Sequence, residues 1–328
     1  MIPDFPALAA ELRQIFDATR PLDGGAVATY IPQLARVPAQ HYGASVVTVD
    51  GQRFDAGDTD VDFTVQSCMK PVNYCCALEE LGEEAVHAIV GREPSGRGFN
   101  ELTLNKENRP HNPMINAGAI ATCSLIRRGS TVSDRFEGVI DLWRRLAGGR
   151  KPGFSNSVYL SEKERGYRNY ALAYFMKEKR VFPEDADLLE TLEFYFQCCS
   201  LETSTSRMAT VAATLANGGV CPVTGERVLR FGTVRSCLSL MYSCGMYDFS
   251  GEFAFSIGLP AKSGVSGALM VVVPNVLGLC TWSPRLDTLG NSVRGIAFCR
   301  ELVRRFNFHN YDDLVGSLES KRDPRRRA

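Results

Sequence analysis

Two β-hairpin patterns, far apart in the chain, place the strongest constraint on its fold. The first occupies residues 46–54, where Asp50 and Gly51 supply the positive φ angles of a two-residue turn between extended runs. The second occupies residues 268–280, where two apolar runs flank a Pro-Asn pair. Most of the sequence between the hairpins has helical periodicity. We therefore predict one sheet that is assembled from both ends of the chain, with a helical region in the middle.

Helical periodicity also predicts an amphipathic helix at residues 6–18 and a closing helix at residues 292–306. A strand is predicted at residues 252–258. The predicted helices between the hairpins span residues 71–81, 83–90, 118–128, 134–146, 164–179, 186–199 and 206–217.

These elements imply an α/β fold of the α+β kind. We expect a single domain over residues 1–328. Residues 1–70 and 220–328 are expected to contain the sheet, and residues 71–219 are expected to be mainly helical.

Composition and charge argue against several classes of function. The chain carries 37 Lys and Arg against 37 Asp and Glu, so it lacks the basic surplus that is typical of proteins binding nucleic acid or an anionic membrane surface. No apolar run reaches membrane-spanning length. The 11 cysteines show no metal-binding spacing, and no signal peptide opens the chain. We expect a cytoplasmic protein with reduced thiols and with no metal, nucleic-acid or membrane partner.

The run Thr-Val-Gln-Ser-Cys-Met-Lys-Pro at residues 64–71 carries the strongest catalytic signal. On a helix, Ser67 and Lys70 are three positions apart and lie on one face. A serine hydroxyl becomes a good nucleophile when a neighbour takes its proton, and a lysine does so when burial or nearby positive charge lowers its pKa. The pattern predicts a nucleophile and its base. The alternative is an N-cap serine followed by a solvated lysine.

Two stretches near the second hairpin strengthen the prediction for Ser67. Residues 259–267 contain Lys-Ser-Gly among small residues, which allows backbone N–H groups to face an oxyanion. The alternative there is a plain glycine-rich turn. Residues 244–251 place Tyr247 in a glycine-flanked turn, where a phenol near a lysine can relay protons. The alternative for Tyr247 is half-buried packing.

Polar residues in the helical middle offer groups for a zwitterionic substrate. Asn116 lies just before a small-residue helix start, and residues 161–169 place Glu162 and Asn169 in one turn-rich stretch. The alternatives are helix capping for Asn116 and a solvated charged face for residues 162–169.

Six runs carry a resemblance to a known family. They are QSCMKP at 66–71, PHNPMINAGAI at 110–120, FYFQ at 194–197, ATLANGG at 213–219, CGMYDFSG at 244–251 and LPAKSGV at 259–265. In this order they closely resemble the serine-dependent glutaminases, the β-lactamase-like L-glutamine amidohydrolase family. The resemblance extends over about residues 24–315 and is closest to the catalytic domain of the animal kidney and liver types.

The resemblance implies a β-lactamase/DD-peptidase-like fold, in which helices flank an antiparallel sheet beside a helical subdomain. It also implies hydrolysis of L-glutamine to L-glutamate and ammonia by a homodimer or homotetramer without a metal or organic cofactor. A processed animal-type chain would lie in the mitochondrial matrix.

The resemblance further implies a role for each matching residue. Ser67 would be the nucleophile, Lys70 its base and Tyr247 the proton relay to the leaving ammonia. The backbone N–H groups of Ser67 and Val265 would form the oxyanion hole. The residues implied in substrate binding are Tyr30, Ser67, Asn116, Glu162, Asn169, Tyr195, Tyr247 and Val265.

One departure concerns the loop at residues 91–103. There Glu101 and Thr103 stand where the mammalian kidney type has a lysine and a phenylalanine. Because that loop gates activity in the kidney type, phosphate activation and interface-directed inhibition are not carried over to this chain.

Three other interpretations have less support from the sequence. A β-lactamase or penicillin-binding enzyme also pairs Ser-x-x-Lys with a Lys-x-Gly strand, but this sequence has no Ser-Asp-Asn between them and no export signal. A catalytically impaired glutamine sensor would keep Asn116, Glu162 and Tyr195 and lose a catalytic group, yet all three catalytic groups are present. The four scattered histidines give no support to a serine–histidine hydrolase.

Overall fold

The structure, a computed structural model, describes residues 2–96, 98, 101–312 and 321–326. Its centre is a five-stranded antiparallel sheet with the strand order β2-β1-β8-β7-β6. The strands are β1 (Gly43–Thr48), β2 (Arg53–Gly57), β6 (Ala261–Ser263), β7 (Ala268–Val273) and β8 (Leu277–Trp282). β1 pairs with β8, so that Ala44 lies opposite Thr281. The predicted sheet made from both ends of the chain is therefore confirmed.

Both predicted hairpins form, and the first has a longer turn than expected. Thr48 and Gln52 continue the ladder, because the Thr48 N–H donates to the Gln52 carbonyl at 2.9 Å. The connection consequently contains residues 49–51 rather than two residues. The Asp50 carboxylate, which accepts a hydrogen bond from the Thr48 hydroxyl, holds this turn.

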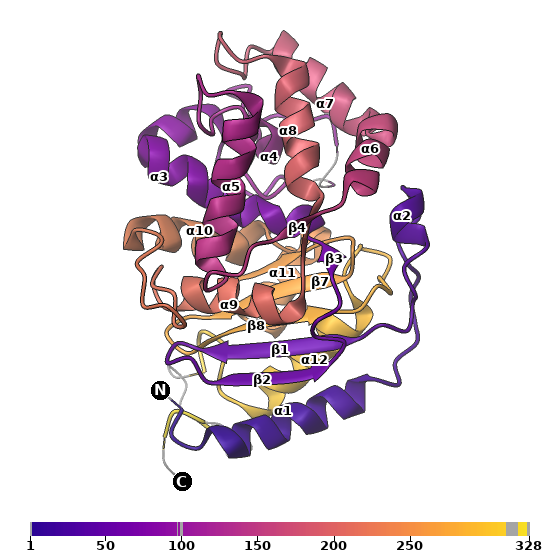
Figure 1. Ribbon diagram of the computed structural model, residues 1–328, viewed down its shortest axis with the longest axis vertical. Helices are drawn as coiled ribbons and strands as arrows, with labels where there is room; N and C mark the ends of the chain where they lie inside the picture. Colours follow the sequence, from indigo (N-terminus) through magenta and orange to yellow (C-terminus); the bar gives the residue numbers. More distant parts are fainter. Residues whose placement is uncertain (1, 97, 99–100, 313–320, 327–328) are drawn as a thin grey trace.

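Helices cover both faces of the sheet (Figure 1). α1 (Phe5–Thr19) and α12 (Val293–Arg305) pack on one face, and α9 (Thr205–Ala216) packs on the other. α9 lies so close to β8 that a Cβ at Gly278 would be 2.1 Å from the backbone nitrogen of Ala213. This contact needs a glycine in the strand and small residues in the helix. α9 therefore packs on the sheet, although it lies within residues 71–219, which are predicted to be the mainly helical region.

The other elements form the part of the molecule above α9 in Figure 1 and the connections to it. The helices are α2 (Pro32–Ala35), α3 (Met69–Ile89), α4 (Asn116–Cys123), α5 (Val132–Leu146), α6 (Asn156–Arg165), α7 (Tyr167–Glu178), α8 (Leu188–Cys199), α10 (Phe231–Cys244) and α11 (Ser250–Ser256). Two 3₁₀ turns, η1 (Gln66–Cys68) and η2 (Tyr247–Phe249), and a small sheet complete the fold. That sheet has the order β3 (Phe63–Thr64), β5 (Leu201–Thr203), β4 (Gly153–Phe154). Within the described ranges, no helix is both long and apolar enough to cross a membrane.

The predicted strand at residues 252–258 is wrong, because residues 252–256 belong to α11 and the helix ends there. Alternating phenylalanines suggest a half-buried strand, but the structure buries Phe253 and leaves Phe255 84% exposed. The next buried apolar residue is Ile257, four positions after Phe253, which is the spacing of a helix. α10 is absent from the predicted helices, although its buried residues also follow helical spacing.

The helix predicted at residues 164–179 forms as α7 but begins at Tyr167, because α6, which was not predicted, ends at Arg165 and the two helices meet at Gly166. A Cβ at Gly166 would lie 2.5 Å from the Glu162 carbonyl oxygen and 2.7 Å from the Phe196 ring. The missing side chain lets α8 approach the junction. Glu162 lies within α6, which precedes this junction, and therefore lies in a helix and not in a turn.

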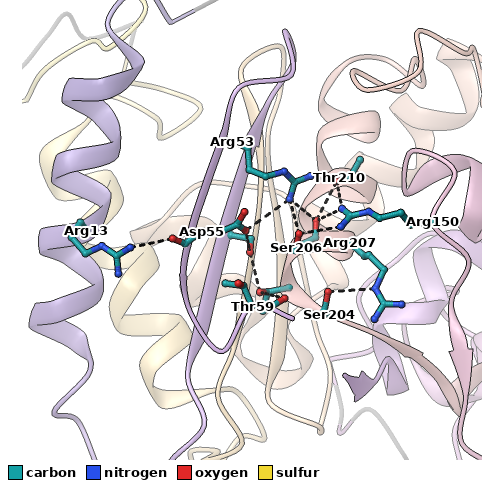
Figure 2. A network of polar contacts seen from close by, with 11 residues as sticks. Arg13, Arg53, Asp55, Thr59, Arg150, Ser204, Ser206, Arg207 and Thr210 are labelled. Atoms are coloured by element: carbon teal, nitrogen blue, oxygen red, sulfur yellow. Dashed lines mark hydrogen bonds and ion pairs between the residues drawn. The ribbon is translucent and has the colours of Figure 1, made fainter. Parts of the chain in front are cut away.

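A network of arginines fastens α9 to the sheet and to the chain before β4 (Figure 2). Arg53 of β2 donates to the Ser206 hydroxyl at 2.8 Å and to the Thr210 hydroxyl at 2.7 Å. Arg150 donates to the same two hydroxyls at 3.2 and 3.3 Å. We call Arg53 and Arg150 the arginine pair. Its two guanidinium groups bind one turn of α9 from two sides.

Candidate active site

Ser67 lies where the chain passes from a strand into a helix. β3 ends at Thr64, and the Val65 N–H donates to the Leu201 carbonyl at 2.8 Å. Gln66 then adopts a left-handed φ of 48°, which is uncommon for a residue with a side chain and is held here by the surrounding structure. Ser67 follows in η1, and Lys70 lies in the first turn of α3.

Lys70 is buried, so the alternative of a solvated lysine is wrong. Only 1% of the residue is exposed, and its Nζ donates to Oδ1 of Asn116 at 2.6 Å. Burial lowers the pKa of Lys70 to about 8, although nearby thiols act in the opposite direction. A large share of Lys70 is therefore neutral near pH 8 and able to accept a proton.

Asn116 is the first residue of α4, and its side chain faces Lys70 instead of capping the helix. Its amide nitrogen donates to Oδ1 of Asn169, in the first turn of α7, at 3.0 Å. Lys70, Asn116 and Asn169 thus form one hydrogen-bonded chain that joins three helices.

Tyr247, in η2, lies against a second buried lysine. Lys262 of β6 places its amine 4.5 Å from the centroid of the Tyr247 ring and donates to two backbone carbonyls at 3.0 and 2.7 Å. Burial, then the charge of Lys70, lowers the pKa of Lys262. Burial raises the pKa of Tyr247, against the effect of a hydrogen bond with the Ser67 side chain. The amine of Lys262 is a functional group to which the sequence analysis assigns no role; its signal in the sequence is a lysine between the small residues Ala261 and Ser263.

The turn after β6 lies against the segment that carries Ser67. A Cβ at Gly264 would be 3.0 Å from the Val65 carbonyl oxygen and 3.2 Å from the Cys68 sulfur. Val265 comes next and packs against apolar side chains at α2 and α6. The structure therefore brings the backbone near Val265 to the start of η1.

Glu162 is buried in α6, so the solvated charged face is wrong for this residue. It is 4% exposed, and the Tyr30 hydroxyl donates to its Oε1 at 2.5 Å while lying 2.8 Å from Oε1 of Gln66. Burial raises the pKa of Glu162, against hydrogen bonds to Tyr30 and Gln66. In the described part of the chain, no lysine or arginine nitrogen lies within 4 Å of this carboxylate. Glu162 is a buried acid with neutral partners, placed to receive a cationic group.

Tyr195 lies in α8 beside this acid. Burial, then the Cys199 thiol and Glu162, raise the pKa of Tyr195. Gln66 is a further polar group of the site that was not singled out from the sequence. Its signal was its position, directly before Ser67 and after an apolar residue.

A cavity of about 520 Å³ opens beside Tyr247. Its walls include Met114, Ser243 and, from the loop at residues 91–103, Pro94 and Ser95. Residues 97, 99 and 100 of that loop lie outside the described residues. The cavity therefore lies between the loop that departs from the kidney type and the Tyr247 ring.

The thiols and acids of the site do not form a metal centre. Across the described residues, no group of three or more His, Cys, Asp or Glu side chains is arranged to hold a metal ion. All 11 cysteines are buried free thiols. Burial raises the pKa of Cys68, next to Ser67, to about 11, so its nucleophilic thiolate is scarce.

Comparison with known proteins finds the same family by sequence and by structure. The profile of the family described as Glutaminase matches residues 25–311. The mitochondrial liver isoform of glutaminase from Rattus norvegicus is 52% identical over 326 residues, which are 99% of this chain and 54% of that protein. A glutaminase from Nostoc sp. is 44% identical over 300 residues, which are 91% of this chain and 89% of that protein. The chain spans about half the length of the animal relatives that it matches.

Solved structures agree with these sequence matches. A structure described as probable glutaminase ybaS superposes with a TM-score of 0.86 at 38% identity and covers 90% of this chain and 95% of its own. Mglu in its glutamate form gives a TM-score of 0.88 at 37% identity, over 93% of this chain and 69% of its own. These likenesses confirm the predicted β-lactamase-like fold, with its antiparallel sheet and flanking helices. By family profile, full-length sequence identity and fold, the chain belongs to the glutaminase family.

Proposed function

We propose that this protein is an L-glutamine amidohydrolase (EC 3.5.1.2), which hydrolyses L-glutamine to L-glutamate and ammonia through an acyl-enzyme on Ser67. The observation that carries the proposal is the state of Lys70. It lies one helical turn after Ser67, it is buried, and its hydrogen-bond partner is the neutral amide of Asn116. Such a lysine can serve as a base near neutral pH.

In the proposed first step, the Ser67 oxygen attacks the γ-carbonyl carbon while its proton passes to the Lys70 amine. The backbone N–H groups of Ser67 and Val265 stabilise the negative charge that develops on the carbonyl oxygen. The proton then reaches the leaving nitrogen through the Tyr247 hydroxyl, and ammonia departs. Water releases glutamate by the reverse sequence of proton transfers.

The substrate groups find complementary partners in the helical region. Glu162 has only neutral partners among the described residues, which suits the α-ammonium group of glutamine. Tyr30, Asn116, Asn169 and Tyr195 provide hydroxyl and amide groups for the rest of the amino-acid end. Because these groups and Ser67 are held by separate segments of the fold, a substrate shorter by one methylene would be misaligned, and asparagine should be a poor substrate.

Further parts of the proposal rest on family membership. The chain is proposed to act as a homodimer or homotetramer, to need no metal or organic cofactor, and to work in the cytoplasm or, as the rat relative's name suggests, in mitochondria. Light scattering at micromolar concentration tests the assembly, and a monomer alone would contradict it.

Ammonia release from glutamine by the purified protein tests the proposed activity. Asparagine and a penicillin-type substrate serve as contrasts, and we expect kcat/KM for glutamine to exceed both by at least about tenfold. Glutamine binding without turnover would support the impaired sensor, and penicillin hydrolysis would support the β-lactamase interpretation. Ser67→Ala is the matched control. An active Ser67→Ala protein would contradict the acyl-enzyme and direct attention to Cys68.

A further inference from the structure

Asn116 makes a contact that substrate binding does not explain. Its Oδ1 accepts a hydrogen bond from the Lys70 amine, a group of the protein, at 2.6 Å. Its other amide atom is engaged too, since Nδ2 donates to Asn169 at 3.0 Å. Turning the amide over would place its NH₂ group against the Lys70 amine and lose both bonds. The contacts with Lys70 and Asn169 together favour the orientation in which Oδ1 of Asn116 faces the Lys70 amine.

The surroundings of Lys70 contain little that would hold a proton on it. The titratable groups that face it are the thiols of Cys68 in η1, Cys123 in α4 and Cys199 in α8 and the amine of Lys262 in β6. In the part of the chain that the structure describes, no carboxylate oxygen lies within 4 Å of the Lys70 amine. Asn116 is therefore the polar side chain that directs this amine.

We propose that Asn116 is a positioning residue for the general base, in addition to the substrate contact that the proposed function gives it. The inference rests on the proposed function. An amide oxygen accepts an N–H from either the ammonium or the neutral amine, so it orients Lys70 in both states. Unlike a carboxylate, it carries no net charge and therefore favours the ammonium much less than a carboxylate would.

The proton balance shows why this matters. When the bond between the Ser67 oxygen and the γ-carbon forms, the Ser67 proton moves to the lone pair of the Lys70 nitrogen. One N–H of the neutral amine remains on Asn116, so the lone pair is left free for Ser67. The resulting ammonium keeps the same bond to Asn116 and can pass a proton on toward the leaving nitrogen.

Two isosteric substitutions separate this role from substrate binding. Asn116→Asp puts a carboxylate on the Lys70 amine, and Asn169→Asp puts one a single residue further along the hydrogen-bonded chain. Both new charges repel the carboxylate of the substrate and should raise KM. We expect Asn116→Asp to move the acidic limb of the kcat–pH profile upward by about one to three pH units, and Asn169→Asp to move it clearly less. An unmoved limb in Asn116→Asp, or an equal movement in both variants, would overturn the proposal.

A second readout does not depend on turnover. In the Ser67→Ala protein, ¹⁵N NMR titration of the lysine amines should show Lys70 titrating at higher pH when Asn116→Asp is added, and shifting clearly less when Asn169→Asp is added. This result stands even if the wild-type protein fails to hydrolyse glutamine, so the two proposals can fail separately. If Asn116→Asp does not fold, Asn116→Ser removes the acceptor without adding charge. We expect it to lower kcat at least tenfold at every pH, and a wild-type kcat would overturn the proposal.

Discussion

Two places in this molecule bring like charges together, and they use different residues. At the candidate active site, the amines of Lys70 and Lys262 are both buried. Burial lowers the pKa of each amine, so each loses its proton more easily. At the arginine pair, Arg53 and Arg150 share two hydroxyls of α9 (Figure 2). Burial and the charge of Arg53 also lower the pKa of Arg150, but from a value so high that it stays charged.

The difference lies in what each pair is asked to do. An arginine presents a planar set of N–H donors and a permanent charge, which suits a fixed junction between a helix and a strand. A lysine amine can be neutral or charged, which suits a group that takes and returns a proton. The following predictions exchange or remove these properties, beginning with the largest expected effect.

Lys70→Arg should reduce kcat by about three orders of magnitude or more, close to the loss caused by Ser67→Ala. The substitution keeps the positive charge and removes the ability to lose it, so a structural role for the charge predicts near-normal turnover instead. Steady-state ammonia release measures the effect, and circular dichroism checks the fold.

Tyr247→Phe should lower kcat by about 10² or more with KM little changed, because the ring over Lys262 is kept and only the hydroxyl is lost. The comparison of kcat and KM across glutamine concentrations separates proton relay from packing. Near-normal turnover would return Tyr247 to the packing alternative.

The wild-type kcat should rise with pH and level off above about pH 8, where Lys70 becomes neutral. Well below that pH, each unit of acidification protonates Lys70 further and should cost about tenfold in rate. Stopped assays between pH 5.5 and 9.5, with circular dichroism at each pH, provide the measurement. A flat profile over this range would show that the protonation of Lys70 does not control the rate. The lysine pair would then not differ from the arginine pair in this function.

Arg53→Lys is the reverse exchange and should have the smallest effect. A lysine can reach Ser206 or Thr210 but not both in the geometry of a guanidinium, so we expect a loss of about 1 kcal/mol in the free energy of unfolding. Turnover should be unchanged, because no proton is exchanged at this site. Urea denaturation followed by fluorescence measures the loss, and a fall in kcat would show that the two pairs are coupled.

Local chemistry made part of this structure predictable. The two hairpins follow from turn residues and alternation, and the Ser67–Lys70 spacing follows from helix geometry. The segment at residues 252–258 shows the limit, because its alternating phenylalanines fit a strand until one knows that Phe255 is exposed.

The rest of the site depends on contacts between distant residues. Lys70 could be solvated or buried as far as its neighbours in sequence show, and the structure decides by placing α4 and β6 around it. Asn116 contacts Lys70 on α3 and Asn169 on α7, two helices that the local sequence does not bring together. The burial of Lys262 does not follow from the sequence, because a lysine in a strand usually faces solvent.

The pairing of β1 with β8 determines how late in translation the central sheet can form. Ala44 of β1 pairs with Thr281 of β8, so β1 and β8 can pair only after residue 281 has been synthesised. Most of the polypeptide must therefore leave the ribosome before the central sheet forms. β6 and Tyr247 are synthesised late, after the entire helical region. A nascent chain that stops before them would already contain Ser67 and Lys70 but would lack the part of the site that β6 and Tyr247 supply. Incomplete chains would therefore be inactive. Pulse-labelled translation intermediates should gain protease resistance in one step near the end of synthesis.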